Sequence, residues 1–140
     1  MRGQPVESWG NETFSSIDCT NLSRFIFDRK HFSSLNKRVK PAAFNDPNLR
    51  VSSFWIDILT DHQIWHIGDT VAGGPRKKPT IARADFRKSD VLDLKLSIEA
   101  DPKPHARHVE VCSWPTEKDA RILLAIELCV RSQLLIREAK

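Results

Sequence analysis

The 140-residue sequence has no apolar run that approaches the roughly 20 residues of a membrane-spanning helix. Its first 14 residues contain no continuous apolar segment, so they lack the central part of a secretory signal peptide. Cysteines are few, and Cys19, Cys112 and Cys129 lie far apart in the sequence, which fits reduced thiols better than a disulfide framework. We therefore expect a cytoplasmic protein that is not attached to a membrane.

Complete motifs of several enzyme classes are also missing. The chain contains no Walker A, GxGxxG or GxSxG sequence, so nucleotide hydrolysis, Rossmann-type redox chemistry and α/β-hydrolase chemistry have no support. His62 and His66 lie four positions apart but without the glutamate of an HExxH metal site, and we interpret them as surface residues. His105, His108 and Cys112 lack the paired ligands that zinc sites have at both ends. We expect no metal and no cofactor.

The composition is that of an ordinary soluble domain, with 40% hydrophobic and 29% charged residues. A chain of this length can bury about two-thirds of its unfolded surface, so one core is sufficient to stabilise it. Residues 1–20 have apolar side chains at no fixed period, and we expect a loosely ordered tail there. Residues 21–140 are expected to form a single domain.

Hydrophobic periodicity predicts five strands and two helices. The predicted strands are a short one that starts at Leu22, followed by 49–59, 80–86, 91–101 and 108–112. One helix is predicted at 61–72, where Thr60 and Gln63 can form a capping box, and a longer one from Pro115 to the C-terminus. This order favours an α+β domain with a mainly antiparallel sheet of about five strands and with helices packed on one face.

The same pattern predicts one hydrophobic core. The clearest strands and the long helix would contribute Leu94, Leu96, Ile98, Phe54, Ile56, Ile126 and Val130. The full inward stripe of the helix is predicted to be Ile122, Leu123, Ile126, Val130 and Leu134.

Positive charge is concentrated in two segments of a chain whose net charge is +4. The cations that could contact a polyanion are Arg29, Lys30, Lys37, Arg38, Lys40, Arg76, Lys77 and Lys78. Phe25, Phe27 and Phe32 lie among the first group, as in proteins that bind phosphates and stack on bases. The leading hypothesis is therefore a non-enzymatic module that binds nucleic acid or an acidic protein. The alternative is a solvated loop surface, with the aromatic rings in the core.

The segment PHARHVEV, residues 104–111, suggests a second function. His105 and His108 could act as general base and general acid, while a cation such as Arg107 or Lys40 stabilises a pentavalent phosphate, as in a metal-independent ribonuclease. A regular strand would point the two rings to opposite faces, whereas a turn after DPKP could bring them together. The competing interpretation is that both are polar turn residues, one of them bonded to Asp101.

The stretches RVKPAAF and ADPKPHARHVEVCSWP, together with the strand before the first helix, resemble a group of small uncharacterised bacterial proteins. The resemblance covers the chain from about residue 22 to the C-terminus. It implies a bacterial single domain and no particular activity, cofactor or partner. Exposed strand edges would also allow a homodimer.

Overall fold

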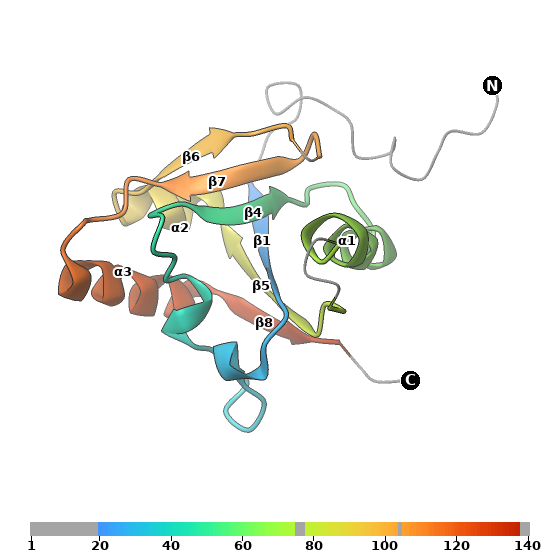
Figure 1. Ribbon diagram of the computed structural model, residues 1–140, viewed down its shortest axis with the longest axis horizontal. Helices are drawn as coiled ribbons and strands as arrows, with labels where there is room; N and C mark the ends of the chain where they lie inside the picture. Colours follow the sequence, from blue (N-terminus) through green and yellow to red (C-terminus); the bar gives the residue numbers. More distant parts are fainter. Residues whose placement is uncertain (1–19, 75–77, 104, 138–140) are drawn as a thin grey trace.

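The computed structural model describes residues 20–74, 78–103 and 105–137, so the predicted N-terminal tail lies almost entirely outside the described residues. The described part forms a six-stranded antiparallel sheet with the strand order β6-β7-β4-β1-β5-β8 (Figure 1). The α+β class and the antiparallel sheet agree with the sequence prediction. The counts differ, because six strands pair in this sheet and three α-helices are described.

The six strands of the sheet are β1 (Asn21–Ile26), β4 (Val51–Trp55), β5 (Ala82–Arg87), β6 (Ser97–Ala100), β7 (His108–Cys112) and β8 (Gln133–Ile136). A separate small hairpin consists of β2 (Phe32–Ser33) and β3 (Arg38–Val39). The α-helices are α1 (Asp61–Ile67), α2 (Lys88–Asp93) and α3 (Lys118–Arg131). None of the helices within the described ranges is long and apolar enough to cross a membrane.

The sheet is covered on both faces, because alternate residues of its strands enter two different cores. Leu22 of β1 packs in a core that also contains Val91 of α2 and Leu128 of α3. Phe25, on the opposite face of β1, packs in a second core with Ile64 of α1. The expectation that all helices lie on one face is therefore wrong: α2 and α3 cover one face of the sheet, and α1 covers the other.

The prediction of a single core is wrong, and some of the residues assigned to it lie elsewhere. The predicted strand at 91–101 does contribute buried or partly buried residues to the first core, namely Leu94, Leu96 and Ile98. Phe54 and Ile56 belong to the second core instead. Ile126 and Val130, expected to face inward from the long helix, are 39% and 77% exposed.

The segment 91–101 is a strand only at its end. Residues Lys88–Asp93 form α2, at whose start the Asp90 carboxylate accepts a hydrogen bond from the Arg87 N–H at 3.1 Å. Lys95 then adopts a positive φ of 65°, and β6 begins at Ser97. Leu92, which the alternating pattern placed inside, is half exposed because it lies on the outer side of α2.

The C-terminal segment is a helix followed by a strand, not one long helix. The helix α3 ends at Arg131, where the Ser132 hydroxyl donates a hydrogen bond to the Leu128 carbonyl at 2.6 Å. The chain then continues as β8, in which Leu134 pairs with Ala84 of β5. The sequence contains no glycine or proline after Pro115 that would have indicated this break.

The capping box at the start of α1 is confirmed. Thr60 Oγ1 accepts a hydrogen bond from the Gln63 N–H, and the Gln63 side chain accepts one from the Thr60 N–H. Thr60→Ala is therefore expected to lower the free energy of unfolding by about 1 kcal/mol, because an amide of the first turn loses its partner. Urea denaturation would measure this loss. Thr60→Ser keeps the hydroxyl and should leave stability nearly unchanged, and equal losses for Thr60→Ala and Thr60→Ser would contradict a role for the hydroxyl.

Candidate functional site

Residues 105–108 of the PHARHVEV segment form a turn, directly after the segment where the sequence predicts one. The His108 N–H donates to the His105 carbonyl at 2.9 Å, and the Arg107 N–H donates to His105 Nδ1 at 3.1 Å. The turn leads directly into β7, which pairs with β4. It separates the Arg107 side chain from the His105 and His108 rings, with which it was predicted to share a substrate.

Arg107 lies inside the protein, with 0% of its surface exposed. Its Nη1 donates hydrogen bonds to the backbone carbonyls of Trp55, at 3.2 Å, and Asp57, at 2.7 Å. Its guanidinium carbon lies 4.3 Å from the centroid of the Trp55 ring, which is a cation–π contact. The guanidinium therefore ties the start of β7 to the end of β4.

The same junction is fixed on its other side by Asp57. The Asp57 carboxylate accepts hydrogen bonds from the backbone and side chains of Thr20 and Asn21, at distances from 2.6 to 3.3 Å. Burial alone would raise the pKa of Asp57, but these hydrogen bonds outweigh it and lower the pKa below its ordinary value. The carboxylate therefore stays charged and holds the first residues of β1.

His108 is part of a chain of polar contacts that crosses three segments. Its Nε2 lies 2.7 Å from the hydroxyl of Ser52 on β4, and its Nδ1 lies 2.9 Å from the backbone carbonyl of Asp101. The Asp101 carboxylate is 3.6 Å from the same Nδ1. Only 6% of His108 is exposed. His108 is therefore the imidazole that contacts Asp101.

His105 packs beside the same aromatic ring as His108. The ring centroid of Phe54 lies 5.2 Å from that of His108 and 6.5 Å from that of His105. His105 is 6% exposed, and its Nε2 is buried. The turn thus brings the two rings to one side chain, while Arg107 points into the core. Catalysis by His105 and His108 as a pair stays a prediction.

The predicted polyanion-binding residues fall on one end of the molecule, so far as the structure describes them. Arg29 and Lys30 form a short 3₁₀ turn after β1, and Lys37, Arg38 and Lys40 lie on or beside the β2–β3 hairpin (the blue and cyan segments in Figure 1). All five are exposed, as is Lys78. Arg76 and Lys77 lie outside the described residues.

The two basic segments meet at Asp28. The backbone hydrogen bond from Lys30 lowers the pKa of Asp28, although burial opposes it. The charges of His31, Lys30 and Lys78 lower this pKa further. Lys78 belongs to the second predicted cluster and lines the same cavity as Asp28 and His31, so residues about 50 positions apart in the sequence face one site.

A cavity of about 260 Å³, which we call the aromatic cleft, lies between these segments. Its walls are Arg24, Phe25, Phe27, Asp28, His31 and Lys78. Arg24 lies where β1 and β4 diverge after pairing at Leu22 and Ser23, and it donates hydrogen bonds to the carbonyls of Ala43 and Ser52. The cleft therefore combines aromatic rings with cations from both predicted basic segments.

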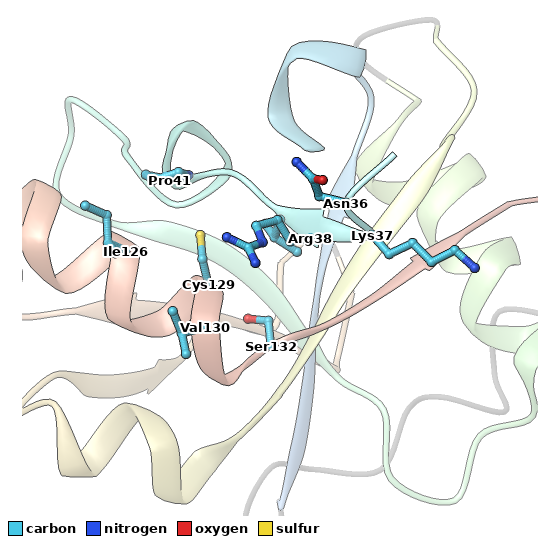
Figure 2. Close-up of a pocket in the computed structure, with 9 residues that line it drawn as sticks. Asn36, Lys37, Arg38, Pro41, Ile126, Cys129, Val130 and Ser132 are labelled. Carbon is cyan, nitrogen blue, oxygen red and sulfur yellow. The ribbon is translucent and has the colours of Figure 1, made fainter. Parts of the chain in front are cut away.

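A larger cavity, of about 400 Å³, lies between the β2–β3 hairpin and α3. Figure 2 shows its two sides, with Lys37 and Arg38 on the hairpin and with Ile126, Cys129 and Val130 on the helix. Burial raises the pKa of the Cys129 thiol to about 12, so the thiol stays protonated and is a poor nucleophile at neutral pH. This cavity has cations on one side and apolar side chains on the other, but no reactive group.

Two features of this region were not predicted from the sequence. The first is the contact between Ser52 and His108. Nothing in the sequence around Ser52 distinguishes it from any other serine in a strand, and the contact forms only because β4 pairs with β7. Arg24 is, in the sequence, only one more cation, whereas its place at the divergence of two strands makes it part of a cleft. Within the described residues, no group of three or more histidine, cysteine or acidic side chains could hold a metal ion.

No protein-family model, curated protein or solved structure matches this chain. Any function is therefore argued from the side chains themselves.

Proposed function

We propose that the protein binds single-stranded nucleic acid through its basic end. The contacts would come from a basic surface that consists of Arg29, Lys30, Lys37, Arg38, Lys40 and Lys78, and from the aromatic cleft beside it. The single observation that carries the proposal is that the cleft places Phe25 and Phe27 next to Lys78 and the 29–40 segment. Proteins that bind single strands combine cations that follow the backbone with aromatic rings on which bases stack.

Unneutralised charge supports this proposal. None of the six cations of the basic surface forms an ion pair with another described residue, whereas Arg50, Arg83, Arg131 and Arg137 all do. A cation that forms no ion pair within the protein can bind a phosphate without first breaking such a pair. The basic surface is therefore suited to an anionic chain.

The size of the cleft also supports it. A protein cavity of about 150 Å³ is enough to bind benzene, and the aromatic cleft measures about 260 Å³. A planar base could therefore stack on Phe27, which is partly exposed, while its phosphates lie along the cations outside. An acidic protein would use the cations but would leave the exposed part of the Phe27 ring without a contact, whereas Phe25 is buried in the second core in either case.

The test is fluorescence anisotropy with labelled single-stranded RNA and DNA at several salt concentrations. The double variant Arg29→Gln/Lys30→Gln should weaken binding for all sequences and reduce the slope of log K against log salt by about 0.7 for each cation that no longer neutralises a phosphate of the single strand. Phe27→Ala should weaken binding by about 5- to 150-fold, because stacking contributes about 1–3 kcal/mol per base.

The matched control is Lys95→Gln/Lys118→Gln, which removes the same charge from exposed positions outside the basic surface. Affinity close to that of the unmodified protein is expected for this control. If the control lost as much affinity as Arg29→Gln/Lys30→Gln, net charge alone would explain binding. No binding at low salt, or binding to acidic peptides but not to oligonucleotides, would refute the proposal.

A further inference from the structure

We propose that Ser52 and His108 form a nucleophile and general-base pair that reacts with small carboxylic esters. The two groups come from neighbouring strands, β4 and β7, and their reactive atoms, Ser52 Oγ and His108 Nε2, are 2.7 Å apart. This activity goes beyond the proposed binding of nucleic acid, because its reacting atoms are different ones, although its cavity shares Arg24, Phe25 and Phe27 with the aromatic cleft. A nucleophile within hydrogen-bond reach of a base, with the base oriented by a third group, is the arrangement that nucleophilic catalysis requires.

The contacts of the ring determine the position of its proton. The backbone carbonyl of Asp101 can only accept, so His108 Nδ1 must carry the hydrogen in the 2.9 Å contact between them. In the neutral ring, Nε2 is then the acceptor, and it receives the hydrogen bond from the Ser52 hydroxyl. Asp101 is thus a positioning residue that fixes the tautomer in which His108 can take a proton from Ser52.

The serine side of the pair is accessible. Ser52 is partly exposed and lines a cavity of about 50 Å³ together with Phe27, Phe54 and Ala72. A cavity of this size accepts a small acyl group and excludes a long one. The walls are mostly apolar, so the hydroxyl is the group in the cavity that can attack an electrophile.

A positive charge is held at the same cavity. Arg24 is part of its lining, and the Arg24 Nη1 donates to the carbonyl oxygen of Ser52 itself at 2.9 Å. A second contact, from Nε to the Ala43 carbonyl at 3.1 Å, fixes the orientation of the guanidinium. Fixed positive charge beside a reacting carbonyl lowers the energy of the oxyanion that develops there. Arg24 is therefore assigned this electrostatic role.

The reaction then follows from these atoms. Ser52 Oγ attacks the ester carbonyl carbon and forms a C–O bond, while its proton moves to His108 Nε2. The tetrahedral intermediate collapses, the bond to the leaving oxygen breaks, and His108 returns the proton to that oxygen. Water then attacks the acyl-Ser52 ester with His108 as base, and Ser52 leaves with the proton. Water is the only co-reactant that is needed.

The test uses two probes on the full-length protein. Hydrolysis of p-nitrophenyl acetate measures turnover, and methanesulfonyl fluoride, a small sulfonyl fluoride, traps the nucleophile as a stable sulfonyl ester with release of fluoride. Peptide mapping by mass spectrometry should find the sulfonyl group on Ser52. Ser52→Ala should lose turnover and labelling, and His108→Gln should slow both on the order of 10²-fold, the usual contribution of a general base.

The matched controls are Ser97→Ala and His105→Gln. Ser97 lies on β6, and its hydroxyl contacts that of Ser113 and no imidazole. We therefore expect Ser97 to remain almost unlabelled, and Ser97→Ala to have almost no effect on turnover. Retained turnover in His105→Gln would assign the base to His108. Circular dichroism and thermal midpoints would show that each variant is folded.

The labelling of the unmodified protein decides the proposal even if a variant fails to fold. Sulfonylation of Ser52 at no greater rate than Ser97 would overturn it, and so would turnover that persists in a folded Ser52→Ala variant. Ester hydrolysis does not involve the basic surface, so a positive result here together with no nucleic-acid binding would refute only the proposed function.

Discussion

Replacing Arg107 with alanine is expected to lower the free energy of unfolding by about 3–5 kcal/mol, the largest effect predicted for a single substitution in this protein. The substitution removes the donor from two carbonyls, that of Trp55, which is buried, and that of Asp57, which is partly buried. Each unsatisfied buried acceptor costs about 1–3 kcal/mol. Removal of the guanidinium also leaves a cavity beside the Trp55 ring, which is itself completely buried.

The conservative variant Arg107→Lys separates charge from shape. A lysine keeps the positive charge but lacks the planar group that stacks on Trp55. We expect it to restore part of the loss and to remain destabilised by about 1–3 kcal/mol. Chemical denaturation followed by tryptophan fluorescence would measure both variants.

The control for this experiment is Arg87→Ala, because Arg87 is an exposed arginine at the end of β5. Its removal should change stability by no more than about 0.5 kcal/mol. Equal stability of the Arg107→Ala and Arg87→Ala variants would show that the buried guanidinium is not structural, and would return Arg107 to consideration as a ligand-binding group.

Arg107 also shows why part of the candidate site could not be predicted from the sequence. An arginine between two histidines in a polar turn indicates a surface position, since charged side chains are seldom fully buried. Its burial depends on two carbonyls about 50 residues earlier in the chain, which no local pattern reveals. The turn at 105–108, in contrast, was predicted from the DPKP segment that directly precedes it.

The contact between Ser52 and His108 was unpredictable for a related reason. The residues are 56 positions apart, and their side chains meet only because β4 pairs with β7 in the register that places Phe54 opposite His108. A shift of one residue would point Ser52 to the other face of the sheet. Sequence patterns predicted segments that contain both strands, but not which strands pair.

Features determined by neighbouring residues were predicted well. The capping box of Thr60 and Gln63 depends on two residues three positions apart, and it is present. The basic residues at 29–40 are exposed, as a polar segment with turn residues indicates. That Lys78 faces the same cleft as this segment required the three-dimensional structure.

The orientation of α3 was mispredicted because the helix is apolar around most of its circumference. Its sequence contains eight apolar residues in the nine positions from Ile122 to Val130. Such a helix satisfies a helical period on more than one face, so periodicity cannot decide which face is buried. In the structure, the buried residues of α3 are Ala125, Leu128 and Cys129.

A pair of truncations on this helix tests the orientation directly. Leu128 is completely buried in the first core, so Leu128→Ala is expected to lower the free energy of unfolding by about 2–5 kcal/mol through reduced burial and the cavity that remains. Val130, which the sequence pattern placed inside, is 77% exposed, and Val130→Ala should change stability by no more than about 0.5 kcal/mol. Both values can be taken from guanidinium chloride denaturation of the two variants under one set of conditions.

A loss for Val130→Ala as large as that for Leu128→Ala would mean that the outer face of α3 is covered in solution. A small loss for Leu128→Ala would mean instead that the helix packs through the stripe formed by Ile122, Ile126 and Val130, because only the residues facing the sheet leave a cavity when they are shortened.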